Sequence, residues 1–341
     1  MQLFFKWAKR HFLAILCSMA FAITLFALIA PWLFATHSSS IAFNSNTGAI
    51  GDTFGIMNPF IAIAAALITF AAFWTQYQAN QEMQKNSDKM QFERQFYEML
   101  KIHCDKVENL HAESLYTDSA TGNQSQKAAK SQDFFRSLLD EFNLIYSELL
   151  KFNETDETFC KAYHIFFSGI DFADKQLRKE TTAHFHSFFA PENNKYLFME
   201  KYPKLAPIAD SLFMGHIDQL VPYYRHLFLL VKTVVQFDDK LFSYADKRQF
   251  LRILRAQLSS AEQTLLLFNW LSGHGKEWEE DASKPNGNHF FSDYRMIHNI
   301  IPEQQPFTKE SILQSILSRN PHYKKLNNED TLFELIDEKR T

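Results

Sequence analysis

Two long stretches without a charged side chain dominate the start of the sequence. The first covers residues 12–34 and the second about residues 56–77. Because a helix rises about 1.5 Å per residue, each stretch is long enough to cross a bilayer core of about 30 Å. Trp32 and Trp74 lie near their ends, where a membrane surface favours amphipathic rings. We therefore expect residues 1–78 to form a hairpin of two transmembrane helices.

The distribution of positive charge predicts how this hairpin is oriented. Lys9 and Arg10 precede the first stretch, and Lys85 and Lys89 follow the second, whereas residues 36–55 contain no Lys or Arg. Since cytoplasmic flanks are enriched in Lys and Arg, we expect a two-pass protein with both termini and the main domain in the cytoplasm. Neither stretch contains an Asp, Glu, Lys or Arg, so a proton relay or transporter site within one chain is not expected.

The composition of the whole chain favours helices over strands. Among 341 residues there are 35 Phe but only 9 Gly and 10 Pro, and few turn formers argue against a many-stranded β protein. The net charge of −4 gives no strong signal for nucleic-acid binding, which usually requires a basic surface. Three widely separated cysteines predict neither a zinc knuckle nor a disulfide framework. We expect a mainly α protein whose cytoplasmic part is an all-α domain.

The cytoplasmic part divides by changes in polarity. Residues 79–113 are expected to form a stalk and a first cytoplasmic helix, and residues 114–132 a polar loop rich in Ser, Thr, Gln and Asn. The main helical domain is expected over residues 133–305. The tail, residues 306–341, is expected to hold two short helices separated by Asn320-Pro321.

Apolar residues recur at helical spacing in five segments of the domain. The predicted helices span Ser131–Phe152, Thr158–Phe167, Asp174–Phe189, about Ile217–Phe237 and about Asp246–Leu271.

The last of these predicted helices carries polar residues beside its apolar stripe. Arg255, Glu262 and Asn269 are spaced by seven residues, which places them on one edge of a continuous helix. They would line a cleft that binds a phosphate, nucleotide or peptide, or they would form a buried polar network that fixes helix packing. The packing network is the favoured interpretation. Gln257 lies nearby in the sequence but points elsewhere.

Arg225 and His226 lie on the preceding predicted helix. If the two helices are antiparallel neighbours, Arg225 would approach Glu262. This contact would contribute to a ligand site or form a partly buried salt bridge, and the salt bridge is the favoured interpretation.

One short pattern is typical of a ribonuclease. Arg178 and His184 have the Arg-x(4–6)-His spacing of helical toxin ribonucleases of the HEPN type, in which His transfers protons and Arg stabilises the phosphorane. A chain with thirteen histidines meets so short a pattern readily by chance. Phosphate-loop, dinucleotide-binding and HExxH motifs are absent, so no cofactor and no metal site are predicted. Whether the protein is an enzyme stays open, with non-enzymatic function favoured.

Three segments resemble the phage abortive-infection protein family (the AbiC-like group). They are Gln91–His103, the Tyr-Tyr-Arg-His-Leu block at 223–227, and the Leu-Arg-Ala-Gln-Leu-Ser block at 254–259 with Glu262 and the Leu-Leu-Leu-Phe-Asn run at 265–269. The resemblance extends from about Phe92 to Ile300. It implies bacterial antiphage defence, in which an infected cell arrests or dies before phage progeny mature, and it implies no particular chemistry.

Together these features predict a membrane-anchored defence effector in the bacterial inner membrane. The helical domain would sense infection through the region of Arg225, Arg255, Glu262 and Asn269, and the hairpins would then perturb the membrane. The expected partners are the lipid bilayer, further copies of the chain, and a phage-derived trigger or partner protein. The alternatives are a membrane-tethered ribonuclease-type toxin and a non-enzymatic scaffold that docks a partner protein.

Overall fold

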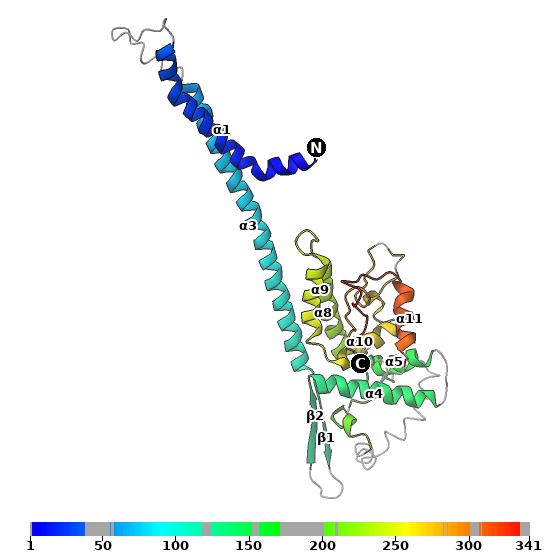
Figure 1. Cartoon of the computed structure of the whole chain (residues 1–341). Helices are drawn as coiled ribbons and strands as arrows, with labels where there is room; N and C mark the ends of the chain where they lie inside the picture. The colour runs from blue at the N-terminus through cyan, green and yellow to red at the C-terminus, as the bar shows by residue number, and fades with distance from the viewer. Residues whose placement is uncertain are drawn as a thin grey trace. The chain divides into compact units, whose positions relative to one another are not determined.

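The computed structural model describes most of the chain. The described residues are 2–37, 55, 58–117, 124–151, 157–170, 201–208, 211–300 except 282 and 285, 307 and 309–334. Over these residues the protein is mainly helical, as predicted, with one pair of strands (Figure 1). The chain divides into two units, residues 1–92 and residues 93–341.

The first unit contains helix α1 (Gln2–His37) and most of α3 (Asn58–Asn109). Two contacts show that the helices are antiparallel. Phe26 of α1 contacts Phe60 near the start of α3, with ring centroids 5.7 Å apart, and the earlier residue Cys17 shares a small cavity with the later residue Ala71. Small side chains lie buried in this unit. They are Ala20, Ala27, Ala64 and Ala71. Small residues let helix backbones approach closely, as in membrane-embedded helix pairs.

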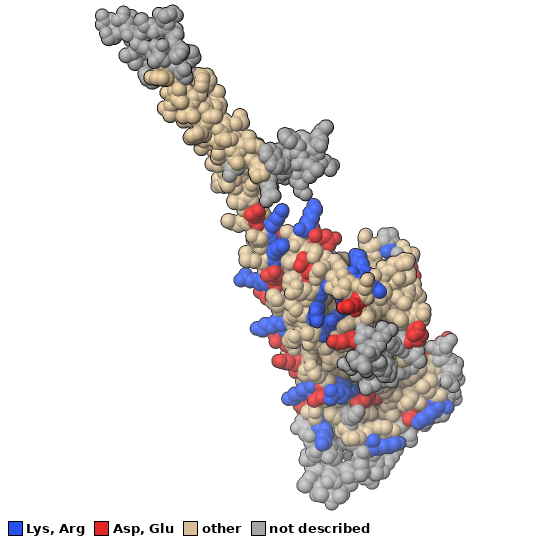
Figure 2. Space-filling model, viewed as in Figure 1, with Lys and Arg blue, Asp and Glu red and all other residues tan. Residues whose placement is uncertain are grey.

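The paired parts of α1 and α3, residues 14–29 and 58–77, have an apolar outer surface. The side chains of Phe21, Leu28 and Phe73 are 70%, 73% and 62% exposed. On the face shown in Figure 2 the described surface of the pair is free of Lys, Arg, Asp and Glu, which appear further along α3. By length and composition α3 is one helix that can cross a membrane, whereas the apolar run Ala14–Ile29 of α1 is shorter. The structure thus gives one candidate span, and the two-helix hairpin stays a prediction.

Helix α3 runs without a break from its apolar segment to Asn109. It therefore contains both the predicted second transmembrane segment and the predicted stalk with the first cytoplasmic helix. Residues 60–109 contain no proline or glycine, which are the residues that most often interrupt a helix.

The second unit is built around aromatic side chains from three helices. These are α4 (Gln132–Leu150), α5 (Thr158–Ser168) and α10 (Ser260–Leu271). The ring of Phe142 contacts Phe159 at 5.4 Å, Phe166 at 5.8 Å and Phe268 at 4.7 Å, measured between centroids. Helices α8 (Ile217–Val235) and α9 (Tyr244–Arg255) pack beside each other (Figure 1). The unit also contains the 3₁₀ helices η2 (Pro203–Ile208) and η3 (Lys276–Trp278) and helix α11 (Lys309–Arg319).

The predicted helices at 131–152, 158–167 and 217–237 agree with α4, α5 and α8 to within a few residues. The predicted helix at 174–189 lies outside the described residues.

The predicted polar loop at 114–132 is wrong in its described part. Strands β1 (His111–Thr117) and β2 (Gln124–Lys130) form an antiparallel hairpin whose register pairs His111 with Lys130 and Thr117 with Gln124. The strands contain few apolar residues, so the alternation that normally indicates a strand is weak. Backbone hydrogen bonds and packing against η2 form the hairpin instead, with Ala129 buried. The unit is therefore not purely α-helical.

The predicted continuous helix at 246–271 is also wrong, because it is divided into α9 and α10. Ser259 has an extended backbone (φ −67°, ψ 162°) and caps α10: its hydroxyl accepts from the Glu262 amide while the Glu262 carboxylate accepts from the Ser259 amide. Ser243 and Asp246 form the same reciprocal cap on α9. A capping box of this kind starts a new helix and so ends the preceding one.

In the tail, α11 confirms the first of two predicted helices. Residues 320–333 form turns and irregular backbone, and the end of the second predicted helix lies outside the described residues. The side chain of Asn320 donates to Ser292 and Asp293, and the amide of Leu326 donates to Asp330. Because side chains satisfy these groups, the segment after Pro321 is stabilised without helical hydrogen bonds.

Gly169 and Gly215 allow the end of α5 to contact the segment before α8. Gly169 has φ +93°, and a Cβ there would lie 2.4 Å from the carbonyl oxygen of Met214. Gly273 also has a positive φ, +86°, but a Cβ there would meet nothing within 4 Å.

We therefore predict that Gly169→Ala lowers the free energy of unfolding by about 3 kcal/mol or more, since backbone strain adds to a collision with main-chain atoms. Gly273→Ala, the control with strain alone, should cost about 1 kcal/mol. Thermal and denaturant unfolding of both variants, followed by circular dichroism in detergent micelles, gives the two values. Equal losses would contradict the close contact at Gly169.

Candidate functional site

Helix α9 presents three arginines on one face. Arg248, Arg252 and Arg255 are separated by four and three residues, which brings their side chains to the same side of a helix. Leu251 and Leu254 lie on the adjoining face of α9, about a quarter of a turn around the helix, and are buried in the core. Their burial leaves the arginine face directed outward.

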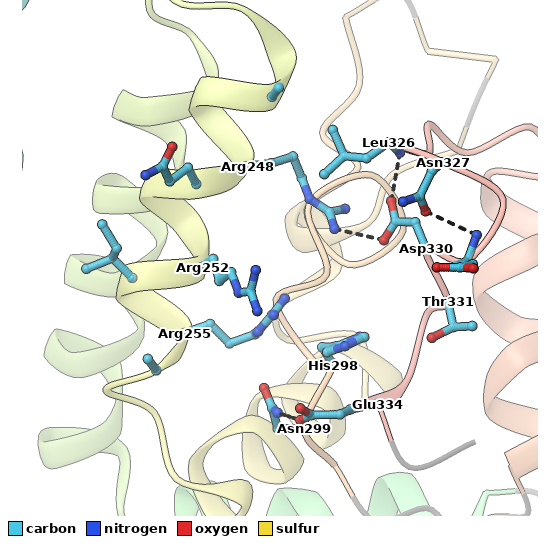
Figure 3. A pocket seen from close by; sticks show the side chains of 15 residues that line it. Arg248, Arg252, Arg255, His298, Asn299, Leu326, Asn327, Asp330, Thr331 and Glu334 are labelled. Carbon is cyan, nitrogen blue, oxygen red and sulfur yellow. Dashed lines mark hydrogen bonds and ion pairs between the residues drawn. The ribbon is translucent and has the colours of Figure 1, made fainter. Parts of the chain in front are cut away.

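The arginine face forms one wall of a cavity of about 910 Å³. His298 and Asn299 line its base, and the segment Leu326–Glu334 forms the opposite wall (Figure 3). We call this cavity the arginine cleft. All of its lining residues belong to the second unit.

Arg248 is held by acidic and carbonyl partners. Its Nη2 lies 2.9 Å from the Asp330 carboxylate, and its Nη1 donates to the Asp293 carbonyl at 2.7 Å. The other oxygen of Asp330 lies 3.0 Å from the fully buried Arg295. Burial alone would raise the pKa of Asp330, but the Leu326 amide and the two arginines hold it below its usual value. Asp330 therefore stays charged and fastens the Leu326–Glu334 wall to α9.

The other two arginines are not neutralised in this way. Arg255 donates to the carbonyl oxygen of Arg295 at 3.0 Å, and burial, followed by the charge of Arg248, lowers its pKa to about 10. Arg252 is exposed and makes no ion pair with a described residue. Figure 3 shows the guanidinium groups of Arg252 and Arg255 side by side, facing His298. This part of the cleft attracts anions, since two positive charges lie together and each can form forked hydrogen bonds.

Glu262 and Asn269 lie in the core, away from the arginine cleft. Glu262 is 1% exposed and accepts from the Ser259 hydroxyl at 2.7 Å and from the Tyr223 hydroxyl at 2.9 Å. Its pKa is raised because burial outweighs these hydrogen bonds. Asn269 donates to the Tyr163 hydroxyl at 3.0 Å. These contacts are those of a polar network between packed helices.

The expected line of Arg255, Glu262 and Asn269 does not form. The break at Ser259 places Arg255 on α9 and the other two residues on α10, so the spacing of seven no longer describes one helix edge. Gln257 is exposed in the turn between the helices.

The expected approach of Arg225 to Glu262 is wrong as well. Arg225 is exposed, and Tyr223 occupies the place beside Glu262. Two residues along a helix correspond to a rotation of about 200°, so when Tyr223 faces the core Arg225 faces away from it. The Nε2 atom of His226 lies 3.0 Å from the Met99 carbonyl oxygen. Arg178 and His184 lie outside the described residues.

Sequence reasoning missed most of the arginine cleft. Only Arg255 was singled out, whereas Arg248 and Arg252 share its face and His298 lies opposite. The Arg-x3-Arg-x2-Arg spacing was a visible signal for the basic wall. No local pattern indicates the acidic wall, because Asp330 follows Arg248 by 82 residues.

His103 of α3 is buried without a hydrogen bond to either ring nitrogen among the described residues. Its ring lies 5.4 Å from that of Tyr223 and stacks at 6.0 Å on His226. Burial, with the nearby charges of His226 and Lys106, lowers the pKa of His103 to about 4. The imidazole is therefore neutral at physiological pH.

Residues 215–305 match the family model described as "putative phage abortive infection protein". The matched segment includes α8, α9, α10 and all three arginines of the α9 face. No curated protein and no solved structure matches the chain. The match confirms the family resemblance of the blocks at 223–227 and 254–269 and supports a role in phage defence, whereas the segment Gln91–His103 lies outside the matched residues.

The lowered pKa of His103 predicts a pH dependence of stability. Above pH 6.5 the imidazole is neutral in both folded and unfolded chains; between pH 6.5 and about 4 only the unfolded chain gains a proton. Stability is therefore fully present above pH 6.5 and is lost as the pH falls, by up to about 3 kcal/mol.

His103→Leu should flatten the fall in the unfolding free energy between pH 7 and pH 5, measured by denaturant titration at each pH. His322→Gln, at an exposed histidine of the tail, is the control for the loss of a histidine. The same slope in His103→Leu as in the unsubstituted protein would show that His103 is not the group responsible.

Proposed function

We propose that this protein is a membrane-anchored bacterial effector of phage defence whose helical domain senses infection and acts on the inner membrane. The family match over residues 215–305 supports the defence role. The single observation that carries the membrane role is the continuity of α3, which begins as an uncharged apolar helix and enters the domain without a break.

The exposed side chains of the first unit support a membrane location. Burying apolar surface contributes roughly 25 cal/mol per Å², and this unit exposes large side chains such as Phe21, Leu28 and Phe73. A bilayer would cover this surface. In the proposed arrangement α1 and the apolar part of α3 both cross the inner membrane, and the flanking Lys and Arg residues keep both termini and the domain in the cytoplasm.

Association of several copies would follow from the same helices. Ala62, Ala65 and Ala66 of α3 are exposed, beside the buried Ala64. Small residues of this kind let a further helix approach closely in a membrane. We place the sensing site at the arginine cleft, around Arg255. Binding of a cue there would change how subunits pack, and the hairpins would then perturb the membrane.

A phage infection assay tests the role of the cleft. Arg252→Ala and Arg255→Ala should each raise the efficiency of plating at least about tenfold over the unsubstituted protein, because each removes a positive charge that would hold the cue. Arg136→Ala, at an exposed arginine of α4, should keep protection. Immunoblots of membrane fractions establish equal abundance. Full protection by both cleft variants would contradict the proposed sensing site.

Membrane potential tests the mode of action. In infected cells that express the protein, a voltage-sensitive dye should report depolarisation before control cells lyse. A maintained potential during growth arrest would contradict membrane perturbation, and accompanying fragmentation of cellular RNA would favour a tethered ribonuclease. Protection that requires a neighbouring gene would favour a scaffold.

A further inference from the structure

We propose that the arginine cleft is a nucleotide-binding site, in which Arg252 and Arg255 hold the phosphates and the acidic Leu326–Glu334 wall holds the nucleoside. As an infection sensor the site rests on the function proposed above, but nucleotide binding can be measured independently of that function.

Positive charge remains in excess on the α9 side of the cleft. The single carboxylate of Asp330 pairs with both Arg248 and Arg295. Arg255 donates to a carbonyl oxygen and lies within the influence of the Glu334 charge, and Arg252 has no ion-pair partner among the described residues. Two adjacent guanidinium groups repel each other unless an anion lies between them. Adjacent phosphates fit this arrangement, because each guanidinium presents parallel N–H groups to phosphate oxygens.

The cavity is larger than a single phosphate ion requires. Its volume of about 910 Å³ lies within the range of roughly 300–1,000 Å³ typical of small-molecule sites. A single phosphate ion would leave most of this space unfilled. The volume suits a ligand that extends from the arginines to the opposite wall.

The opposite wall carries two further carboxylates, those of Glu329 and Glu334, besides Asp330, whose oxygens already accept from Arg248, Arg295 and the Leu326 amide. Asn299 donates to the Glu334 carboxylate (Figure 3). Carboxylates accept hydrogen bonds from hydroxyl and amino groups but repel further negative charge. The ligand is therefore anionic at one end and rich in hydrogen-bond donors at the other. A nucleoside polyphosphate has both ends; inorganic polyphosphate has only the first.

Isothermal titration calorimetry on the full chain in nonionic detergent micelles at low salt tests the proposal. The probes are ATP, adenosine, inorganic tripolyphosphate and the water-soluble anionic lipid dihexanoyl phosphatidylglycerol. ATP should bind more tightly than each of the other three. Arg252→Gln and Arg255→Gln should each weaken ATP binding by about tenfold or more. Arg136→Gln, the matched exposed control on α4, should bind ATP like the unsubstituted protein.

Because Arg252 is exposed, its substitution leaves the core unchanged, and circular dichroism should show the same helical signal. Undetectable ATP binding at millimolar concentration would overturn the proposal. So would adenosine binding as tight as that of ATP, a preference for the lipid or for tripolyphosphate, or full binding by Arg252→Gln and Arg255→Gln.

The two proposals fail in different ways. ATP binding that depends on Arg252 and Arg255 in a protein that gives no phage protection would support the site and count against the defence function. Protection that depends on these arginines without any nucleotide binding would overturn the site and leave the defence function standing.

Discussion

The continuous backbone of α3 is the constraint on which the rest of this account depends. One helix begins in a segment with no charged side chain and ends at Asn109 among the elements of the second unit. An apolar helical surface and a charged helical surface require different surroundings, since burial of apolar area is favourable and burial of unpaired charge is costly. A boundary between lipid and water that falls along α3 satisfies both requirements. This is the physical reason for the proposal that the apolar part of the first unit lies in a membrane and the second unit in the cytoplasm.

Within the second unit, polar side chains are divided between two environments. Glu262, Asn269 and their tyrosine partners are satisfied inside the core, where an unpaired polar group would cost stability. The arginine side chains of α9 line the cleft instead, and of these Arg248 pairs with a carboxylate, that of Asp330. The first group stabilises how the helices pack, whereas the second offers binding energy to a ligand. The same stretch of sequence, residues 243–271, supplies both.

Much of the fold was predictable where one helix buries one apolar face. The spacing of apolar residues located α4, α5 and α8, because each packs a stripe of large side chains against the aromatic core. The break between α9 and α10 was missed although Ser259 and Glu262 carry the capping-box pattern, since the apolar spacing continues across it. The β-hairpin of β1 and β2 was not predicted because both strands are polar and depend on backbone pairing.

The site was less predictable than the fold. Arg255 was identified from its place beside an apolar stripe, but its neighbours in space are Arg252 and His298, not Glu262. The position of Tyr223 beside Glu262 depends on the rotation of α8, which sequence spacing alone does not give relative to another helix. The acidic wall depends on where the tail folds back, and such distant contacts leave no local pattern.

The most direct test of the central claim is the sidedness of the chain in the inner membrane. First, Cys17, Cys104 and Cys160 are changed to serine. Single cysteines then replace Ser45, which lies between the two apolar segments, or Ser283, an exposed residue of the second unit. The account predicts that a membrane-impermeant maleimide labels Ser45→Cys in intact spheroplasts and Ser283→Cys only after lysis. Labelling of both before lysis, or recovery of the protein in the soluble fraction, would contradict a two-pass anchor with a cytoplasmic domain.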